Sequence, residues 1–109
     1  MAMVLGEFYF VRKQDGDLEG KFSNNHSYEI SDEKAKLKWD NVSSNFSGEY
    51  ESHWNENEKY FESKLVIEPK NKDLTIYYLK WTGKEFNFWG EAFLVNDNML
   101  VGHYRDFNE

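Results

Sequence analysis

The sequence predicts an all-β fold, a small antiparallel up-and-down barrel or barrel-like sandwich of about eight strands. Three observations predict it. Apolar and polar side chains alternate along short segments, which is the two-residue period of a half-buried strand. Polar turns separate these segments roughly every 8–12 residues, the spacing of a sandwich or barrel. A glycine and nearby aromatic residues recur in the segments 46–54 and 88–93.

The segment 46–54 shows the strand pattern most clearly. Its odd and even positions divide into two faces of different chemistry. One face carries Phe46, Gly48, Tyr50, Ser52 and Trp54. The other face is polar, so the first face is predicted to point into the molecule.

The same reading applied along the chain gives the remaining strands. The predicted strands are residues 4–13, 18–22, 28–30, 37–40, 46–54, 60–67, 74–81, 86–95 and 99–107. Asp15 and Gly16 predict a tight hairpin turn after the first strand, because glycine accepts the positive φ that such turns require. Pro69 ends the sixth segment, since proline donates no ladder hydrogen bond. Residues 31–34 fit one capped helical turn.

Composition limits the class of protein. With 109 residues the chain fits one domain, residues 1–109. It has no cysteine, which excludes disulfides and thiolate metal sites, and its net charge of −7 argues against nucleic acid or anionic lipid as partners. No apolar stretch is long enough to span a membrane, and the first residues lack the features of a secretory signal. We therefore expect a cytoplasmic protein, although a processed secreted chain would look the same.

Aromatic residues are unusually frequent, with nine Phe, seven Tyr and four Trp. Each ring buries roughly 150–250 Å², more than a core of this size readily encloses. The segments 74–81 and 86–95 are also apolar on both faces. Strands of that kind are covered on both sides. The pattern predicts a homodimer whose interface contains Tyr77, Trp81, Trp89 and Phe93.

The order of the later strands resembles the calycin-like barrels, the group that includes lipocalins and avidins. The resemblance lies in the segments 48–54, 64–67, 78–81, 89–94 and 100–104, over the last two thirds of the chain. It departs from lipocalins at the first strand, where Gly6 is followed by Glu7 and Phe8 rather than by Gly-x-Trp. The resemblance implies a barrel fold and a cup for a small apolar ligand.

The candidate ligand site is a set of aromatic and hydroxyl side chains that strand parity directs to the interior. Its members are Tyr50, Ser52, Trp54, Tyr78, Phe88 and Tyr104. A mostly apolar cup with a few hydroxyls is typical of small-molecule sites. We expect a non-catalytic binding protein that holds a hydrophobic or aromatic ligand in the barrel. A filled core, with its hydroxyls bonded internally, is the alternative.

Two other functions stay open at this stage. An acidic face could dock a basic protein partner, its residues being Glu49, Glu51, Glu56, Glu58 and Glu62. An isomerase- or hydrolase-type enzyme has less support, and a charged His or Glu inside the barrel would favour it. The three histidines do not have metal-ligand spacing, and no nucleotide or nucleophile motif is present. We therefore expect no catalytic residue, metal or cofactor.

Overall fold

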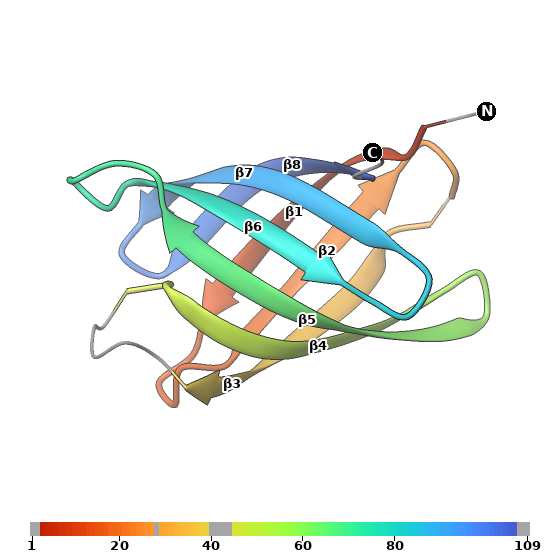
Figure 1. Cartoon of the computed structure of the whole chain (residues 1–109), viewed down its shortest axis with the longest axis horizontal. Helices are drawn as coiled ribbons and strands as arrows, with labels where there is room; N and C mark the ends of the chain where they lie inside the picture. The colour runs from red at the N-terminus through yellow and green to blue at the C-terminus, as the bar shows by residue number, and fades with distance from the viewer. Residues whose placement is uncertain (1–2, 28, 40–44, 107–109) are drawn as a thin grey trace.

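The chain forms a closed antiparallel β-barrel of eight strands (Figure 1). The computed structural model describes residues 3–27, 29–39 and 45–106. The strands are β1 (Leu5–Arg12), β2 (Leu18–Asn24), β3 (Ser31–Trp39), β4 (Gly48–Glu56), β5 (Lys59–Pro69), β6 (Ile76–Thr82), β7 (Asn87–Asn96) and β8 (Met99–Asp106). Each strand pairs with the next along the chain, and β8 pairs with β1 to close the barrel. The predicted all-β, up-and-down fold is confirmed.

The hairpin turns follow from local chemistry. Gly16 has a φ of 93°, and the backbone N–H of Asp17 donates to the carboxylate of Asp15 at 3.0 Å, so the predicted turn between β1 and β2 is confirmed. The turn between β4 and β5 consists of Asn57 and Glu58, both with positive φ, which matches the right-handed twist of the paired strands.

Strand β3 corrects the sequence prediction. Residues 31–34 form part of one continuous strand rather than a helical turn, and β3 pairs with both β2 and β4. Ser31, Glu33 and Ala35 are buried while the residues between them are exposed, a regular two-residue period. The first inward-facing residues of β3 are polar, so the two-residue period cannot be recognised from the positions of apolar residues alone. The predicted strand at 28–30 includes Tyr28, and those at 37–40 and 99–107 include Asp40 and Phe107; these three residues lie outside the described part.

The barrel is filled by its own side chains. The buried apolar residues form one contact cluster that receives side chains from all eight strands. Fully buried members such as Phe10, Leu65, Leu79 and Leu100 occupy the interior. An eight-stranded barrel is just wide enough for this filling. The filled-core alternative therefore describes most of the interior.

A glycine makes room for the largest interior ring. Gly90 is buried, and a Cβ there would lie 3.2 Å from Cζ3 of Trp81 and 2.6 Å from the backbone oxygen of His103. We expect Gly90→Ala to reduce the free energy of unfolding by about 2 kcal/mol, because the neighbouring strand and the indole must both shift. Urea denaturation followed by circular dichroism measures this. Thr82→Ala, at an exposed position, serves as the control, and equal stabilities of the two variants would contradict the argument.

The inner and outer faces of β6 and β7 are apolar for different reasons. Tyr77 and Trp81 point into the barrel and are buried, so the prediction that they belong to an outer interface is wrong. They are apolar because they fill the core. Trp89 is half-buried against the outer rings, and Phe93 is 55% exposed. The homodimer stays a prediction, now confined to the outward-facing residues.

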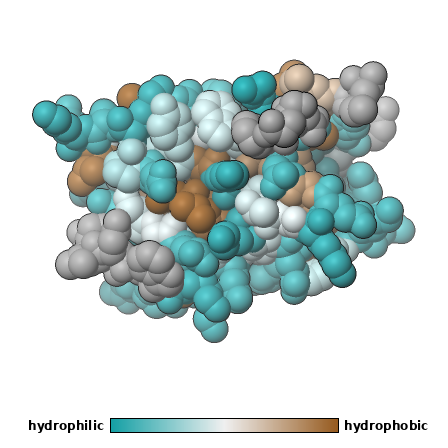
Figure 2. Space-filling model, in the orientation of Figure 1, coloured by the Kyte–Doolittle hydropathy of each residue, from teal (hydrophilic) through white to brown (hydrophobic). Residues whose placement is uncertain are grey.

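The outer surface is mostly hydrophilic on the face shown in Figure 2, with a few hydrophobic side chains near its centre. Within the described residues, no helix has both the length and the apolar character needed to cross a membrane.

Candidate functional site

Aromatic rings lie close together at one end of the barrel. This end carries the β4–β5 and β6–β7 turns (Figure 1). Successive rings contact one another in a closed circuit, with ring centroids 5.3 to 6.1 Å apart. We call this circuit the aromatic collar; its members are Phe22, Trp54, Phe86, Phe88 and Tyr104. They come from β2, β4, the β6–β7 turn, β7 and β8, so the circuit encloses the barrel axis.

Trp54 packs against three other rings. Phe61 stacks on it at 5.7 Å with an interplanar angle of 20°, and Phe22 and Phe86 meet it edge-on. Its indole Nε1 is buried and has no hydrogen-bond partner among the described residues. Buried Trp N–H groups usually find a partner, so this donor is an unsatisfied polar group within an otherwise aromatic layer.

Phe86 differs from the other collar members because it does not belong to a strand. It lies in the turn between β6 and β7, and its side chain is only half-buried. Gly83 in the same turn makes space for it, since a Cβ there would lie 2.1 Å from the Phe86 ring. Turns open more readily than paired strands, so Phe86 is the collar ring that can be displaced most easily.

A buried carboxyl group lies beside Trp54 of the collar. Glu33 faces inward from β3 and is the register partner of Trp54 on β4, so the two side chains are neighbours on the inner surface. Ser52 Oγ donates a hydrogen bond to Glu33 Oε2, and Trp81 Nε1 donates to the same oxygen at 2.8 Å. Because Trp81 belongs to β6, this bond crosses the barrel interior.

Burial changes the ionisation of Glu33. Loss of hydration raises the pKa of its carboxyl from 4.5 to about 7, although the hydrogen bonds from Ser52 and Trp81 act in the opposite direction. The ion pairs formed among the described residues lie on the outer surface, and none of them includes Glu33. Burial therefore favours the protonated form of this carboxyl, and no cationic side chain is paired with it among the described residues.

Polar groups line the rim beside the collar. Asn24 Nδ2 donates to the hydroxyl oxygen of Tyr104 and to Glu56 Oε2, both at 2.9 Å. Burial raises the pKa of Tyr104, so its hydroxyl stays protonated. The barrel mouth thus combines aromatic surfaces with hydroxyl, amide and carboxyl groups.

The structure brings only part of the predicted ligand set together. Trp54, Phe88 and Tyr104 belong to the collar, and Ser52 lies below it, bonded to Glu33. Tyr50 lies toward the opposite end of the barrel, where its hydroxyl donates to the backbone oxygen of Phe46 at 2.7 Å.

Tyr78 was placed inside the barrel by strand parity, and this placement is wrong. Its side chain is 36% exposed and contacts Trp89 on the outer surface. The reason is that Tyr77 and Leu79 take the inward positions of β6. An apolar segment with aromatic residues on both faces does not itself identify the inner one.

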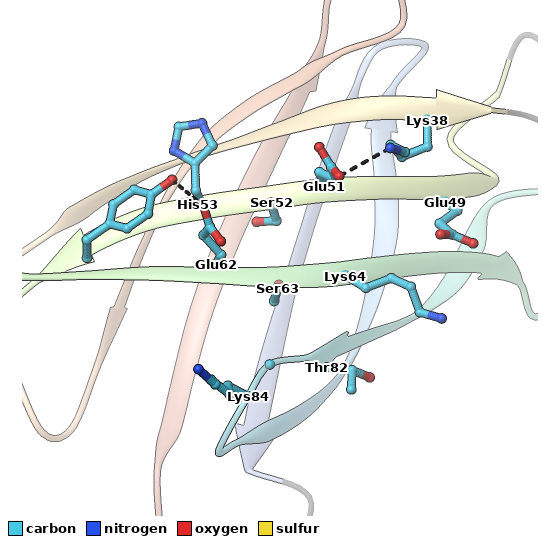
Figure 3. A pocket seen from close by; sticks show the side chains of 12 residues that line it. Lys38, Glu49, Glu51, Ser52, His53, Glu62, Ser63, Lys64, Thr82 and Lys84 are labelled. Carbon is cyan, nitrogen blue, oxygen red and sulfur yellow. Dashed lines mark hydrogen bonds and ion pairs between the residues drawn. The ribbon is translucent and has the colours of Figure 1, made fainter.

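The glutamates of the predicted acidic face do not form a single acidic surface. A hollow of about 530 Å³ lies on the outside of β3 to β6. Figure 3 shows the glutamates and lysines that are interleaved along it. Lys38 pairs with Glu51 at 3.2 Å, and Lys64 and Lys84 line the same hollow. Glu56 turns toward Asn24 at the rim instead, and Glu58 lies in the β4–β5 turn. The surface is of mixed charge rather than uniformly acidic.

The comparisons with protein-family models, curated proteins and solved structures found no match for this chain. Across residues 3–27, 29–39 and 45–106, no group of three or more His, Asp or Glu side chains is placed to hold a metal ion.

Sequence reasoning missed Glu33, Phe22 and Phe86. Glu33 was detectable in principle, because lysines and an aspartate alternate with Ser31, Glu33, Ala35 and Leu37. Phe22 was assigned to a strand but not to the site, and Phe86 was assigned to a strand that begins one residue later.

Proposed function

We propose that this chain is a non-catalytic binding protein of calycin-like type that holds a small hydrophobic or aromatic ligand at the aromatic collar. The observation that carries the proposal is the closed circuit of rings at one end of the barrel, in which Trp54 has a buried Nε1 without a partner among the described residues. Apolar walls with a few directed polar groups are the usual composition of small-molecule sites.

The filled interior restricts the size and position of the ligand. Because Phe10, Leu65 and Leu79 are fully buried below the mouth, a long ligand has no space in the barrel axis. A ligand of about one ring fits best at the collar, where it replaces Phe86 against Trp54 and Phe61. When the ring of the ligand replaces the ring of Phe86, the aromatic contacts with Trp54 and Phe61 are preserved.

The proposal predicts that removal of Phe86 improves binding. Isothermal titration with 2-phenylethanol measures the affinity of the native chain and of Phe86→Ala. We expect the variant to bind about tenfold tighter, because an apolar cavity of one ring binds a small aromatic molecule without first displacing a side chain. Phe93→Ala, on the outer surface, removes the same ring and is expected to leave the affinity unchanged.

Nuclear magnetic resonance locates the binding site in the same titration. The indole N–H signal of Trp54 is expected to shift on addition of 2-phenylethanol, while that of Trp89 on the outer surface stays in place. Shifts confined to the outer surface, or no saturable binding by either the native chain or Phe86→Ala, would contradict the proposal.

A second candidate function is proton transfer by Glu33, because a carboxyl with a pKa of about 7 is suited to general acid–base catalysis at neutral pH. Incubation of the protein with phenylacetone in deuterium oxide distinguishes proton-transfer catalysis from ligand binding. An enzyme would remove a proton from the carbon beside the carbonyl and return a deuteron, and Glu33→Gln would abolish this exchange. A binding protein would leave the exchange rate at its solvent value.

A further inference from the structure

The aromatic collar and the buried Glu33 carboxyl together form a site of a more specific kind. We propose that the mouth recognises a small organic cation, an arylalkyl ammonium whose ring packs in the collar and whose ammonium group meets Glu33. This inference rests on the proposed function and names the chemical class of its ligand.

Glu33 has no counter-charge among the described residues. Glu33 is 5% exposed, and its two hydrogen bonds come from neutral donors, Ser52 and Trp81. An ionised carboxylate buried without a cation is strongly unfavourable, whereas one that is paired and hydrogen-bonded is tolerated. An ammonium group from a ligand supplies the positive charge that the described interior lacks.

The aromatic rings near Glu33 also favour a cation. The faces of aromatic rings carry partial negative charge and attract a cation within about 6 Å of their centroids. Trp54, the residue opposite Glu33 in the β3–β4 ladder, is a collar member, and Trp81 links Glu33 to Tyr104 through a ring contact of 5.8 Å. Trp81 presents its N–H edge to Glu33, so the neighbouring ring of Trp54 is the one whose face a cation beside Glu33 would meet.

A third observation indicates that this layer of the barrel is built for polar contacts. Ser63 Oγ is buried and without a partner among the described residues, and Ser63 is the register partner of Ser52. Figure 3 shows the two serines side by side on β4 and β5. An ammonium has three donors, and two serine hydroxyls and a carboxylate are suitable acceptors for them.

Charge is the property that the test isolates, so it uses two probes of nearly equal shape. Phenethylamine is a cation at neutral pH, and 2-phenylethanol is its neutral counterpart. At pH 7.5 we expect the native chain to bind the amine about tenfold more tightly than the alcohol, the effect of one charge-assisted hydrogen bond. This comparison needs no substitution.

Substitutions then test which carboxyl causes the preference for the amine over the alcohol. Glu33→Gln keeps the side-chain shape and is expected to reduce amine affinity about tenfold while alcohol affinity changes less than about threefold. Glu68→Gln, an exposed carboxyl on the outside of β5, controls for net charge and is expected to keep the preference. Glu56→Gln tests the carboxyl at the rim.

The outcomes separate this inference from the proposed function. Equal affinity for both probes, survival of the preference in Glu33→Gln, or its loss in Glu56→Gln or Glu68→Gln would overturn the cation site and leave the apolar ligand site intact. No binding of either probe by the native chain or by Phe86→Ala would overturn both.

Discussion

At pH 8, Glu33→Gln is expected to be more stable than the native chain by up to about 3 kcal/mol. The native protein must bury an ionised carboxylate at this pH, whereas the variant buries a neutral amide that still accepts hydrogen bonds from Ser52 and Trp81. Replacement of an isolated buried charge by a neutral group of equal shape removes its desolvation cost.

The pH dependence follows from the direction of the pKa shift. The pKa of Glu33 is about 7 in the folded state and near 4.5 in the unfolded chain. Between these values the folded state holds the proton and the unfolded state releases it, so the native chain loses stability as pH rises from about 4.5 to about 7. The groups that interact with Glu33 are Ser52 and Trp81 through hydrogen bonds and Tyr104 through the charge of the carboxylate, and they are unchanged in the variant.

Urea denaturation of both proteins from pH 4 to pH 9 measures this difference. Because every other titratable group is shared, the difference between the two curves isolates Glu33. The expected result is a difference near zero at pH 4 that grows to a plateau above pH 7.5. A difference independent of pH, or one that grows toward acid, would contradict the buried position assigned to the carboxyl.

Trp81→Phe is the second substitution with a large expected effect. We expect it to lower the free energy of unfolding by about 3 kcal/mol at pH 8. The change removes the only donor that reaches Glu33 from β6 in the described structure, and it leaves space beside Gly90. Both consequences act on the folded state, one through the hydrogen bond and one through packing.

The hydrogen-bond part can be separated from the packing part. The Trp81 bond lowers the pKa of Glu33, so its loss is expected to raise that pKa and to cost more at pH 8 than at pH 4.5. In the double variant Trp81→Phe/Glu33→Gln, the change in the free energy of unfolding should differ from the sum of the two single-variant changes by about 1 to 2 kcal/mol. Equal losses at both pH values, with additive energies, would mean that Trp81 acts through packing alone.

The strand pattern made the barrel predictable because inward positions such as Tyr50 and Trp54 alternate with charged ones. The same reasoning failed on β3, where the inner residues Ser31 and Glu33 are as polar as their outward neighbours. It also failed at Tyr78, because β6 carries large apolar residues on both faces and only the pairing with β5 and β7 fixes which face is inside.

The collar was only partly predictable for a different reason. Trp54, Phe88 and Tyr104 were grouped by parity, which identifies a shared face but not a shared height along the barrel. Tyr50 satisfies the same parity and lies toward the other end. Height depends on the register of the strand pairs, which single-sequence patterns do not specify. Phe86 lies in a turn, where parity has no meaning.

Direct observation of the Glu33 carboxyl carbon by nuclear magnetic resonance tests the central claim, that a titratable carboxyl lies inside the collar end and receives the ligand. The account predicts a titration midpoint near pH 7 in the free protein, and a midpoint at least one pH unit lower when phenethylamine is saturating. A midpoint near 4.5 that phenethylamine does not move would contradict it.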